Sequence, residues 1–331
     1  MNKTAVQEEL LFNRLTKRYR HLKKWARRTA INAFRLYDRD IPEIPLVLDL
    51  YDDAIAGALY KRPYEKDGEK DWLCAMKSAV ARAISIPESR IFLKVRQRMR
   101  HRQEEGLQYE KNSERYFYRD VCEGDLSFRV NLSDYLDTGL FLDARKKRVL
   151  IRAASTGKRV LNLFAYTCSL SVCAAKGGAS QVDSVDLSKT YLEWGQINFA
   201  LNGLKAHNTA APRNSTPGGF DLIRCDVIQF INQACKSALR WDLIILDPPS
   251  FSNSKKMKNT LDLRRDHLEL IRKTLSLLKA GGTLWFSSSA KGLKLESGDF
   301  PGLDIKDRGK ELVDEDFLGK RMPLCYTFAK P

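Results

Sequence analysis

The second half of the chain alternates short apolar runs with longer segments of helical periodicity. The apolar runs, each of strand length, lie at 159–166, 181–187, 220–226, 241–247 and 282–289. Segments 191–204 and 263–279 repeat apolar residues every three to four positions, as amphipathic helices do. Strands that are apolar almost throughout are buried on both faces, so this alternation predicts a parallel sheet with helices on both sides, an α/β fold.

The first half has a different pattern. A helix is predicted over residues 8–31, because the apolar positions that recur on one face are Leu11, Leu15, Leu22, Trp25 and Ala26. Strand-like segments lie at 32–38, 45–60, 91–96, 115–121 and 126–132, with a helix at 72–84. We therefore expect two domains: a small α+β domain at 1–130 that begins with the helix, and the α/β domain at 131–331. Residues 315–330 are expected to supply a closing antiparallel hairpin.

Charge adds a first indication of function. The chain has 57 Lys and Arg against 41 Asp and Glu, a net charge of +16, which favours a polyanionic partner such as nucleic acid. Eight Lys or Arg and no acid lie between residues 14 and 28. The alternative is an ordinary solvated helix face. We interpret the run as a phosphate-binding face and expect RNA contacts from Arg14, Lys17, Arg18, Lys23, Lys24 and Arg27.

A second basic segment lies at 94–102. Its cations occupy every other position: Lys94, Arg96, Arg98, Arg100 and Arg102. In an extended chain, a period of two places such side chains on one face. The pattern predicts a basic ribbon for RNA that includes Lys94, Arg96, Arg98 and Arg100; an exposed hairpin arm is the alternative.

Other classes of protein fit the composition poorly. The seven cysteines form no CxxC pair and there are only four histidines, so we expect neither a metal site nor a disulfide framework. No run approaches the roughly 18 apolar residues of a membrane span. The first residues lack the apolar core of a secretory signal. A cytoplasmic protein without a membrane partner is expected.

Acids follow the predicted strands at the edge where open α/β sheets bind ligands. Asp186 ends the second strand, Asp226 the third and Asp247 the fourth. A carboxylate at Asp186 can accept hydrogen bonds from both ribose hydroxyls of an adenosine, and Asp226 can accept from the adenine amino group. A dinucleotide site needs a glycine-rich turn after the first strand, but "NLFAYTCSLS" contains no glycine. The pattern therefore favours S-adenosylmethionine over a nicotinamide cofactor; ordinary strand-end or helix N-cap acids are the alternative.

The fourth strand ends in "LDPPSF", with Asp247, Pro248, Pro249 and Phe251 as candidate catalytic residues. Two prolines fix the backbone and leave carbonyls without local N–H partners. Phe251 offers a face on which a target base can stack. A rigid strand terminator is the alternative interpretation.

Five separated segments carry a resemblance. They are "NRLTKRYRHLKKWARRTAINAFRLYDRDIPE", "NLSDYLDTGLFLDARKKR", "LNLFAYTCSLSVCAA", "SVDLSKTYLEWGQINFALNGL" and "LDPPSFSNSKKMKNTLDLRRDH". In this order they resemble the guanine-N7 methyltransferases of 23S ribosomal RNA, which in bacteria are often the C-terminal half of a bifunctional large-subunit enzyme. The resemblance implies a class I, Rossmann-like methyltransferase with a mixed seven-stranded sheet, an RNA-binding α+β domain, and 23S rRNA or its precursor as partner.

The resemblance also implies site residues. Cofactor positions carried over from the family are Phe141, Asp143, Asn162, Asp186, Asp226 and Asp247, with the neighbours Phe164, Leu187 and Val227. Cys168 stands where the family usually has glycine beside the methionine moiety. A Cβ there crowds the cofactor or needs a costlier backbone conformation, unless the side chain simply fits, which is our expectation.

Rival functions remain open. An RNA cytosine-C5 methyltransferase needs a cysteine nucleophile, and relatives of that kind have it after the fifth strand, where this chain has "FSSSAKG". Methylation of an exocyclic amine, guanine N2 or adenine N6, would also suit "DPPSF". A catalytically silent RNA-binding assembly factor is a third alternative.

Overall fold

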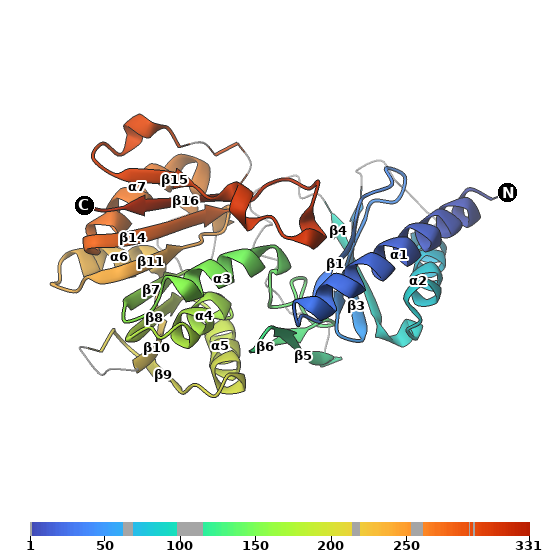
Figure 1. Cartoon of the computed structure of the whole chain (residues 1–331), viewed down its shortest axis with the longest axis horizontal. Coiled ribbons are helices and arrows are strands. Elements are labelled where there is room, and N and C mark those ends of the chain that lie inside the picture. Colours follow the sequence, from blue (N-terminus) through green and yellow to red (C-terminus); the bar gives the residue numbers. More distant parts are fainter. Residues whose placement is uncertain are drawn as a thin grey trace. The chain divides into compact units, whose positions relative to one another are not determined.

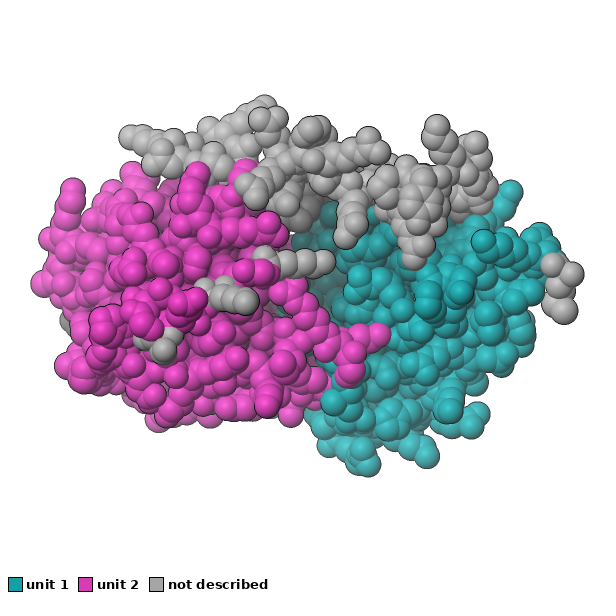
Figure 2. Space-filling view, turned by 90° about the horizontal axis from the view of Figure 1, so that it is seen from above, with its two compact units in different colours: residues 1–142, 315–318 teal, residues 143–314, 319–331 magenta. Residues whose placement is uncertain are grey.

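The chain folds into two compact units. The computed structural model describes residues 2–61, 69–97, 115–213, 219–252, 261–290, 292–293 and 295–331. The first unit contains residues 1–142 and 315–318, and the second contains residues 143–314 and 319–331 (Figure 2). Residues 131–142, which we assigned to the second domain, thus pack with the first unit, and the boundary lies 12 residues later than expected.

The first unit is built on a four-stranded sheet, in the order β1-β2-β3-β4 (Figure 1). Its strands are β1 (Ala33–Asp38), β2 (Leu46–Tyr51), β3 (Ala54–Lys61) and β4 (Ile91–Gln97), and its helices are α1 (Lys3–Arg28), α2 (Glu69–Ile84) and the 3-10 turn η1 (Glu88–Arg90). The first three strands are antiparallel neighbours. Because α2 carries the chain back along the sheet, β4 pairs parallel with β3.

Helix α1 forms as the periodicity predicts. Asn2 caps its start by accepting a hydrogen bond from the Thr4 N–H. The buried face contains Leu11, Leu15, Leu22, Trp25 and Ala26, the five residues expected from the sequence. They join Leu36, Leu48, Met76 and Val80 in one core under the sheet. Burying this stripe leaves the opposite, basic face of α1 exposed.

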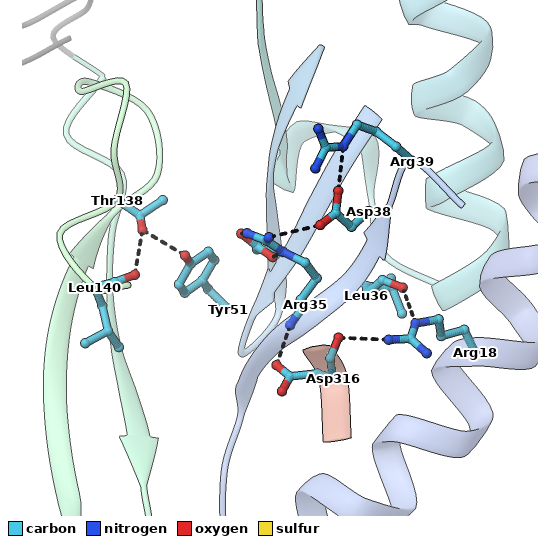
Figure 3. A network of polar contacts seen from close by, with 10 residues as sticks. Arg18, Arg35, Leu36, Asp38, Arg39, Tyr51, Thr138, Leu140 and Asp316 are labelled. Atoms are coloured by element: carbon cyan, nitrogen blue, oxygen red, sulfur yellow. Dashed lines mark hydrogen bonds and ion pairs between the residues drawn. The ribbon is translucent and has the colours of Figure 1, made fainter. Parts of the chain in front are cut away.

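The end of the chain returns to the first unit through η6 (Glu315–Phe317). Asp316 is fully buried there, and its Oδ2 accepts a hydrogen bond from the backbone N–H of Arg35 at 2.9 Å. Its carbonyl accepts from Arg18, whose guanidinium also donates to the carbonyl of Leu36 (Figure 3). Arg35 stacks over the ring of Phe317, 4.8 Å from its centroid. Four residues distant in sequence therefore complete the α1–β1 side of this unit.

Residues 131–142 are tied to the first unit by polar contacts. A hairpin of β5 (Tyr118–Glu123) and β6 (Leu126–Asn131) precedes them. The buried Asp134 accepts hydrogen bonds from the N–H groups of Arg115 and Tyr116 and from the amide of Asn131. The hydroxyl of Tyr51 lies 2.8 Å from that of Thr138 (Figure 3). A hydropathy pattern does not reveal these hydrogen bonds. They explain why residues 131–142 belong to the first unit and the boundary follows residue 142.

The second unit is a doubly wound α/β fold. Its sheet has the order β15-β16-β14-β11-β7-β8-β10-β9. Bounds are β7 (Arg159–Leu163), β8 (Gln181–Asp186), β9 (Ala206–Thr209), β10 (Gly219–Arg224), β11 (Trp241–Leu246), β14 (Leu278–Ser288), β15 (Asp304–Asp307) and β16 (Leu324–Ala329). The six strands from β14 to β9 run parallel. Strand β16 pairs antiparallel with β14, and β15 pairs antiparallel with β16. The class I fold is confirmed, but the described residues form eight strands rather than seven, because β15 adds to the edge.

Helices cover both faces of this sheet. Helices α3 (Arg145–Ala153), α4 (Ser169–Lys176) and α5 (Lys189–Leu201) lie on one face, and α6 (Val227–Cys235) and α7 (Leu263–Ser276) lie on the other (Figure 1). Short turns complete the unit: η3 (Leu142–Ala144), η4 (Ser297–Asp299) and η5 (Gly309–Leu312). The core between the sheet, α6 and α7 contains Phe230, Trp241, Ile271 and Phe286. Across the described residues of both units, no helix is long and apolar enough to cross a membrane.

Candidate functional site

The carboxyl ends of β7, β8, β10 and β11 meet at one edge of the parallel sheet. Leu163, at the end of β7, pairs with Val185 of β8 and with Leu246 of β11. Asp186, at the end of β8, pairs with Arg224 at the end of β10. The acids that follow these strands are therefore neighbours in space, as the sequence predicts, at the edge where such sheets bind ligands.

The loop between β7 and α4 has an unusual backbone. Phe164, Tyr166 and Cys168 have φ angles of 59°, 51° and 61°, the left-handed region that favours glycine. Each such residue costs about 1–3 kcal/mol, and clusters of this kind occur at ligand sites. The Ala165 N–H donates to the carbonyl of Val185 at 3.0 Å, which fixes the loop over β8. The strain thus lies at the first strand end, where we expected the cofactor.

Asp186 is the best-defined acid of the site. Its carboxylate accepts hydrogen bonds from the Tyr166 N–H at 2.9 Å and from the Ser188 N–H at 2.8 Å. Removal from water raises the pKa of Asp186 to about 6, although these backbone donors act in the opposite direction. Leu187 follows it and is half-buried. The carboxylate is held rigidly between the β7–α4 loop and the start of α5, the position expected for a ribose acceptor.

Asp226 has a second role in the structure. It is the N-cap of α6, and its Oδ1 accepts a hydrogen bond from the Gln229 N–H at 2.9 Å. The side chain is half-buried, whereas the next residue, Val227, is 3% exposed. The cap was our alternative interpretation of this acid. An adenine contact at Asp226 would therefore use the second carboxylate oxygen.

Asn162 lies deeper than expected. Its side chain is 1% exposed, and its amide donates to the hydroxyl of Ser171 at 2.8 Å. Ser184 donates to the same hydroxyl, so these side chains tie β7 and β8 to α4. The Oδ1 of Asn162 is buried and accepts no hydrogen bond within the described ranges. Asn162 thus lies beneath α4, one residue before the end of β7, and its cofactor role stays a prediction.

Cys168 fits into the fold. Its thiol is fully buried, and burial raises its pKa far above the ordinary range. A Cβ built on Gly195 of α5 would lie 2.5 Å from the Cys168 sulfur. The side chain therefore occupies the space left by the bare backbone of Gly195, and the structure adopts the costlier left-handed backbone that we considered.

The carboxylate of Asp247 is bonded on both oxygens. Oδ2 accepts from the ammonium of Lys147 at 2.7 Å, and Oδ1 accepts from the hydroxyl of Ser287 at 2.6 Å. Lys147 also donates to the Ser287 oxygen at 2.8 Å, which closes a ring of three side chains. The side chain of Lys147 is 7% exposed and that of Asp247 is 33% exposed. Asp247, the acid that follows the fourth strand, is therefore partly exposed to solvent, whereas the cation that it pairs with is buried. We call the exposed part of this carboxylate its open edge.

The remainder of the motif is partly buried. Pro248 is buried and Pro249 half-buried. Phe251 belongs to a two-residue ladder in which β12 (Phe251–Ser252) pairs with β13 (Leu261–Asp262). The Leu263 N–H donates to the carbonyl of Ser250 at 3.2 Å. Both strand termination and base stacking are compatible with this geometry, in which Phe251 is half-buried.

Lys147 and Ser287 were not among the site residues expected from the sequence. The signal for Lys147 was the inverted pattern of α3, in which Arg145, Lys147 and Arg148 are buried while Val149 is 59% exposed. Buried cations on a short helix need carboxylate partners. Arg145 has Asp314 at 2.9 Å, and Lys147 has Asp247. Their acids lie 100 or more positions along the chain, beyond any local pattern.

Cys325 was also missed, and it bears on the cytosine-C5 alternative. It lies on β16 opposite Ser287 of β14, beside the ion pair of Lys147 and Asp247. Its side chain is fully buried, and burial raises the pKa of the thiol to about 12. A neutral, inaccessible thiol is a poor nucleophile, so this cysteine does not supply the group that C5 chemistry needs.

The predicted positions at the unit boundary are both exposed. Phe141 is 51% exposed, and Asp143 lies in η3. Their cofactor roles stay predictions. The described ranges contain no group of three His, Cys, Asp or Glu side chains arranged to bind a metal ion.

The basic face of α1 divides into two groups. Lys17, Lys23, Lys24 and Arg27 are exposed. Arg14, in contrast, pairs with Asp40 at 2.8 Å, and Arg18 donates to two backbone carbonyls. The first group keeps the predicted character of a phosphate-binding face, and the second is bound to its own unit.

The basic ribbon is corrected at its first two positions. Lys94 donates to the carbonyl of Tyr135, and Arg96 donates to the carbonyl of Leu136 and the carboxylate of Asp137. Desolvation lowers the pKa of Lys94 to about 8, and the neighbouring Arg96 cation adds to that effect. Both cations hold residues 135–137 rather than facing solvent. Arg98 and Arg100 lie outside the described residues.

Comparisons with known proteins agree with this fold. A family model described as S-adenosylmethionine-dependent methyltransferase matches residues 45–293. The ribosomal RNA large subunit methyltransferase K of Neisseria meningitidis serogroup B is 41% identical over 320 residues, which cover 95% of this chain and 85% of the relative. The K/L enzyme of Allochromatium vinosum is 38% identical, and the match covers 96% of this chain and 42% of that one. The chain thus spans about two fifths of the K/L relative.

Solved structures share the architecture. A protein described as a methyltransferase and complexed with SAH superposes with a TM-score of 0.72 at 22% identity, and the match covers 97% of this chain and 81% of that one. A SAM-dependent methyltransferase from Agrobacterium tumefaciens gives a TM-score of 0.59 at 18% identity, and the match covers 86% of this chain and 87% of the other. At these identities the likeness is one of fold.

Proposed function

Since the chain belongs to the family of S-adenosylmethionine-dependent methyltransferases, we propose that it methylates N7 of a guanine in large-subunit (23S) ribosomal RNA. The observation that carries the proposal is the carboxylate of Asp247 at the end of β11, bonded on both oxygens and still partly open. The names of the relatives from Neisseria and Allochromatium support large-subunit rRNA as the substrate.

The strand-end acids fit an adenosine cofactor. When bound, S-adenosylmethionine supplies a methyl group on a sulfonium sulfur. Asp186 would accept hydrogen bonds from the ribose hydroxyls. Removal from water raises the pKa of its carboxyl to about 6, and the ribose hydroxyls would take the place of the missing water. Asp226 would accept from the adenine amino group with the oxygen that does not cap α6. Phe164, Leu187 and Val227 would pack on the adenosine, with Phe141 and Asp143 as further contacts.

The chemistry at N7 needs alignment and charge stabilisation more than proton transfer. Guanine N7 has an in-plane lone pair and no proton to lose, and its methylation leaves a positive purine. In-line transfer is accelerated chiefly by holding donor and acceptor in register. Asp247, held in place by its contact with Lys147, stabilises the developing positive charge through its open edge. Phe251 stacks on the base, and Pro248 and Pro249 keep Asp247 and Phe251 at a fixed separation.

RNA binding is proposed for the basic face of α1. The exposed Lys17, Lys23, Lys24 and Arg27 supply cations for phosphates. Guanine N7 lies in the deep, narrow major groove of A-form RNA, where side chains do not reach it. If the target guanine is base-paired, its helix must therefore be opened or the base flipped out before Asp247 can contact it.

A second candidate is methylation of an exocyclic amine, guanine N2 or adenine N6. The specific observation in its favour is that Lys147 offsets the charge of Asp247, and a charge-balanced carboxylate remains a good hydrogen-bond acceptor for amine protons. Cys168 was the feature in favour of the catalytically silent alternative; its side chain packs against Gly195 in the interior, and measurable cofactor binding would argue against that alternative.

The test is to incubate the purified chain with S-adenosylmethionine and unmodified large-subunit rRNA, digest the RNA and identify methylated nucleosides by mass spectrometry. The proposal predicts 7-methylguanosine. N2-methylguanosine or N6-methyladenosine would favour the second candidate. No methylated nucleoside, although calorimetry detects cofactor binding, would contradict both.

A further inference from the structure

Lys147 is placed to act on the reaction through Asp247. It rises from the first turns of α3, while Asp247 follows β11 and Ser287 lies near the end of β14. The ammonium contacts both partners, at 2.7 and 2.8 Å, and the Ser287 hydroxyl contacts the second carboxylate oxygen at 2.6 Å. Three separate elements therefore fix the orientation of one carboxylate.

Burial excludes two other roles for Lys147. Its side chain is 7% exposed, so a phosphate of bound RNA does not reach the ammonium. It does not face the target base either, because Asp247, 33% exposed, forms the open side of the pair. A buried ammonium is stable only when it is paired, and here the pairing acid is the residue that opens toward the substrate.

We propose that Lys147 is a positioning residue that holds the open edge of Asp247 toward the target base, with Ser287 fixing the second oxygen. The inference rests on the proposed function, since it takes Asp247 as the acid that contacts the base. The ammonium 2.7 Å from one oxygen and the hydroxyl 2.6 Å from the other are donors on opposite oxygens, and together they prevent rotation of the carboxylate. Without Lys147, one of these two donors is lost and the carboxylate is free to turn.

The ion pair of Lys147 and Asp247 also determines the net charge at this point of the site. Lys147 and Asp247 together carry no net charge, so the open edge supplies a directed acceptor rather than an unbalanced anion. As positive charge develops on the target purine, the carboxylate lies between two cations and stabilises both. A neutral side chain at 147 leaves the orientation of Asp247 to Ser287 alone.

The test compares kcat, at saturating cofactor and rRNA, for Lys147→Met, Asp247→Asn and the double variant. Lys146→Met is the matched control, because Lys146 is the neighbouring cation and is exposed. We expect Lys147→Met to lower kcat by about tenfold or more, because the misaligned carboxylate no longer faces the base, and Lys146→Met to leave kcat unchanged. Cofactor affinity should stay within about twofold, which a general loss of structure would not allow.

The double variant isolates the route of the effect. If Lys147 acts through Asp247, the double variant turns over at the rate of Asp247→Asn alone. Multiplied losses in the double variant, or an unchanged rate in Lys147→Met, would overturn the inference while Asp247→Asn remains slow. Full turnover of Asp247→Asn would remove the proposed role of Asp247 and this inference with it. Should Lys147→Met not fold, Ser287→Ala decides: a lowered kcat that adds nothing in the Asp247→Asn background supports the arrangement, and an unchanged kcat contradicts it.

Discussion

The sulfur of Cys168 occupies the space that a side chain at residue 195 would fill. A Cβ on Gly195 would lie 2.5 Å from that sulfur and 3.0 Å from the Cβ of Cys168. Gly195→Ala should therefore lower the free energy of unfolding by about 1–3 kcal/mol, as overpacked cores do. Urea denaturation measures the loss.

The partner variant is the control for this pair. In a Cys168→Gly background the obstructing atoms are absent, so the Gly195→Ala penalty should shrink to a few tenths of a kcal/mol. Equal penalties in both backgrounds would mean that the contact with Cys168 is not what excludes a side chain at 195.

Cofactor binding should depend on pH through Asp186. Removal from water raises the pKa of its carboxyl to about 6, so it is ionised at pH 7.5 and largely protonated at pH 5. Only the ionised form accepts from both ribose hydroxyls. The Kd for S-adenosylmethionine should rise below pH 6 by up to about tenfold per pH unit, as isothermal titration calorimetry would show.

The linkage to stability has the opposite sign. A carboxyl whose pKa is raised on folding binds more protons in the folded state between about pH 4 and pH 6, so its contribution to the stability of the cofactor-free chain falls as pH rises through that window.

The control for the binding prediction is an analogue of the cofactor without the two ribose hydroxyls. Its affinity should lack the drop below pH 6. The same drop with both ligands would assign it to another group.

RNA binding should depend on the exposed cations of α1. Lys24→Ala and Arg27→Ala each remove one predicted phosphate contact. Each should weaken rRNA binding and reduce the slope of log K against log salt by about 0.7–0.9, with cofactor affinity unchanged. Filter binding over a salt series measures this slope. Lys205→Ala, an exposed lysine of the second unit, serves as the control, and an equal change in slope there would argue for diffuse charge instead of a face on α1.

Arg96 should behave as a structural residue. Its guanidinium bonds to Asp137, whose side chain is 15% exposed. Arg96→Met leaves that carboxylate without this partner and should cost about 1–3 kcal/mol of stability, with little change in the salt slope of RNA binding. Arg82→Met is the comparison: Arg82 pairs with Glu8 at the surface and is 50% exposed, so its loss should cost under about 1 kcal/mol. A reduced salt slope with unchanged stability in Arg96→Met would return Arg96 to the RNA-binding face.

The strands of the second unit were predictable because burial imposes their composition. Runs such as 241–247 are apolar on both faces, and the structure places β11 at the centre of the sheet. Strands β9 and β15 were not predicted. They lie at the sheet edges, where "AHNT" and "DIKD" need no apolar pattern. Strand-end acids followed from the same logic, since the position after a buried parallel strand is fixed by topology.

The contacts of individual side chains were not predictable. The alternation of cations at Lys94 and Arg96 indicates a common face, but the sequence does not reveal that residues 135–137 cover it. No sequence pattern pairs Lys147 with Asp247, which lies 100 positions further along the chain and contacts it only in the folded unit. Such pairs are products of tertiary packing, and no local period records them.

The most direct test of the central claim maps the methylated base itself. Wild-type chain and Asp247→Ala are each incubated with S-adenosylmethionine and unmodified large-subunit rRNA, and the RNA is then reduced with borohydride and cleaved with aniline, a treatment that breaks the strand at 7-methylguanosine. The account predicts one new scission at a guanine for the wild type and little or none for Asp247→Ala, whose cofactor binding should persist. Methyl incorporation without scission, or equal scission by both proteins, would contradict it.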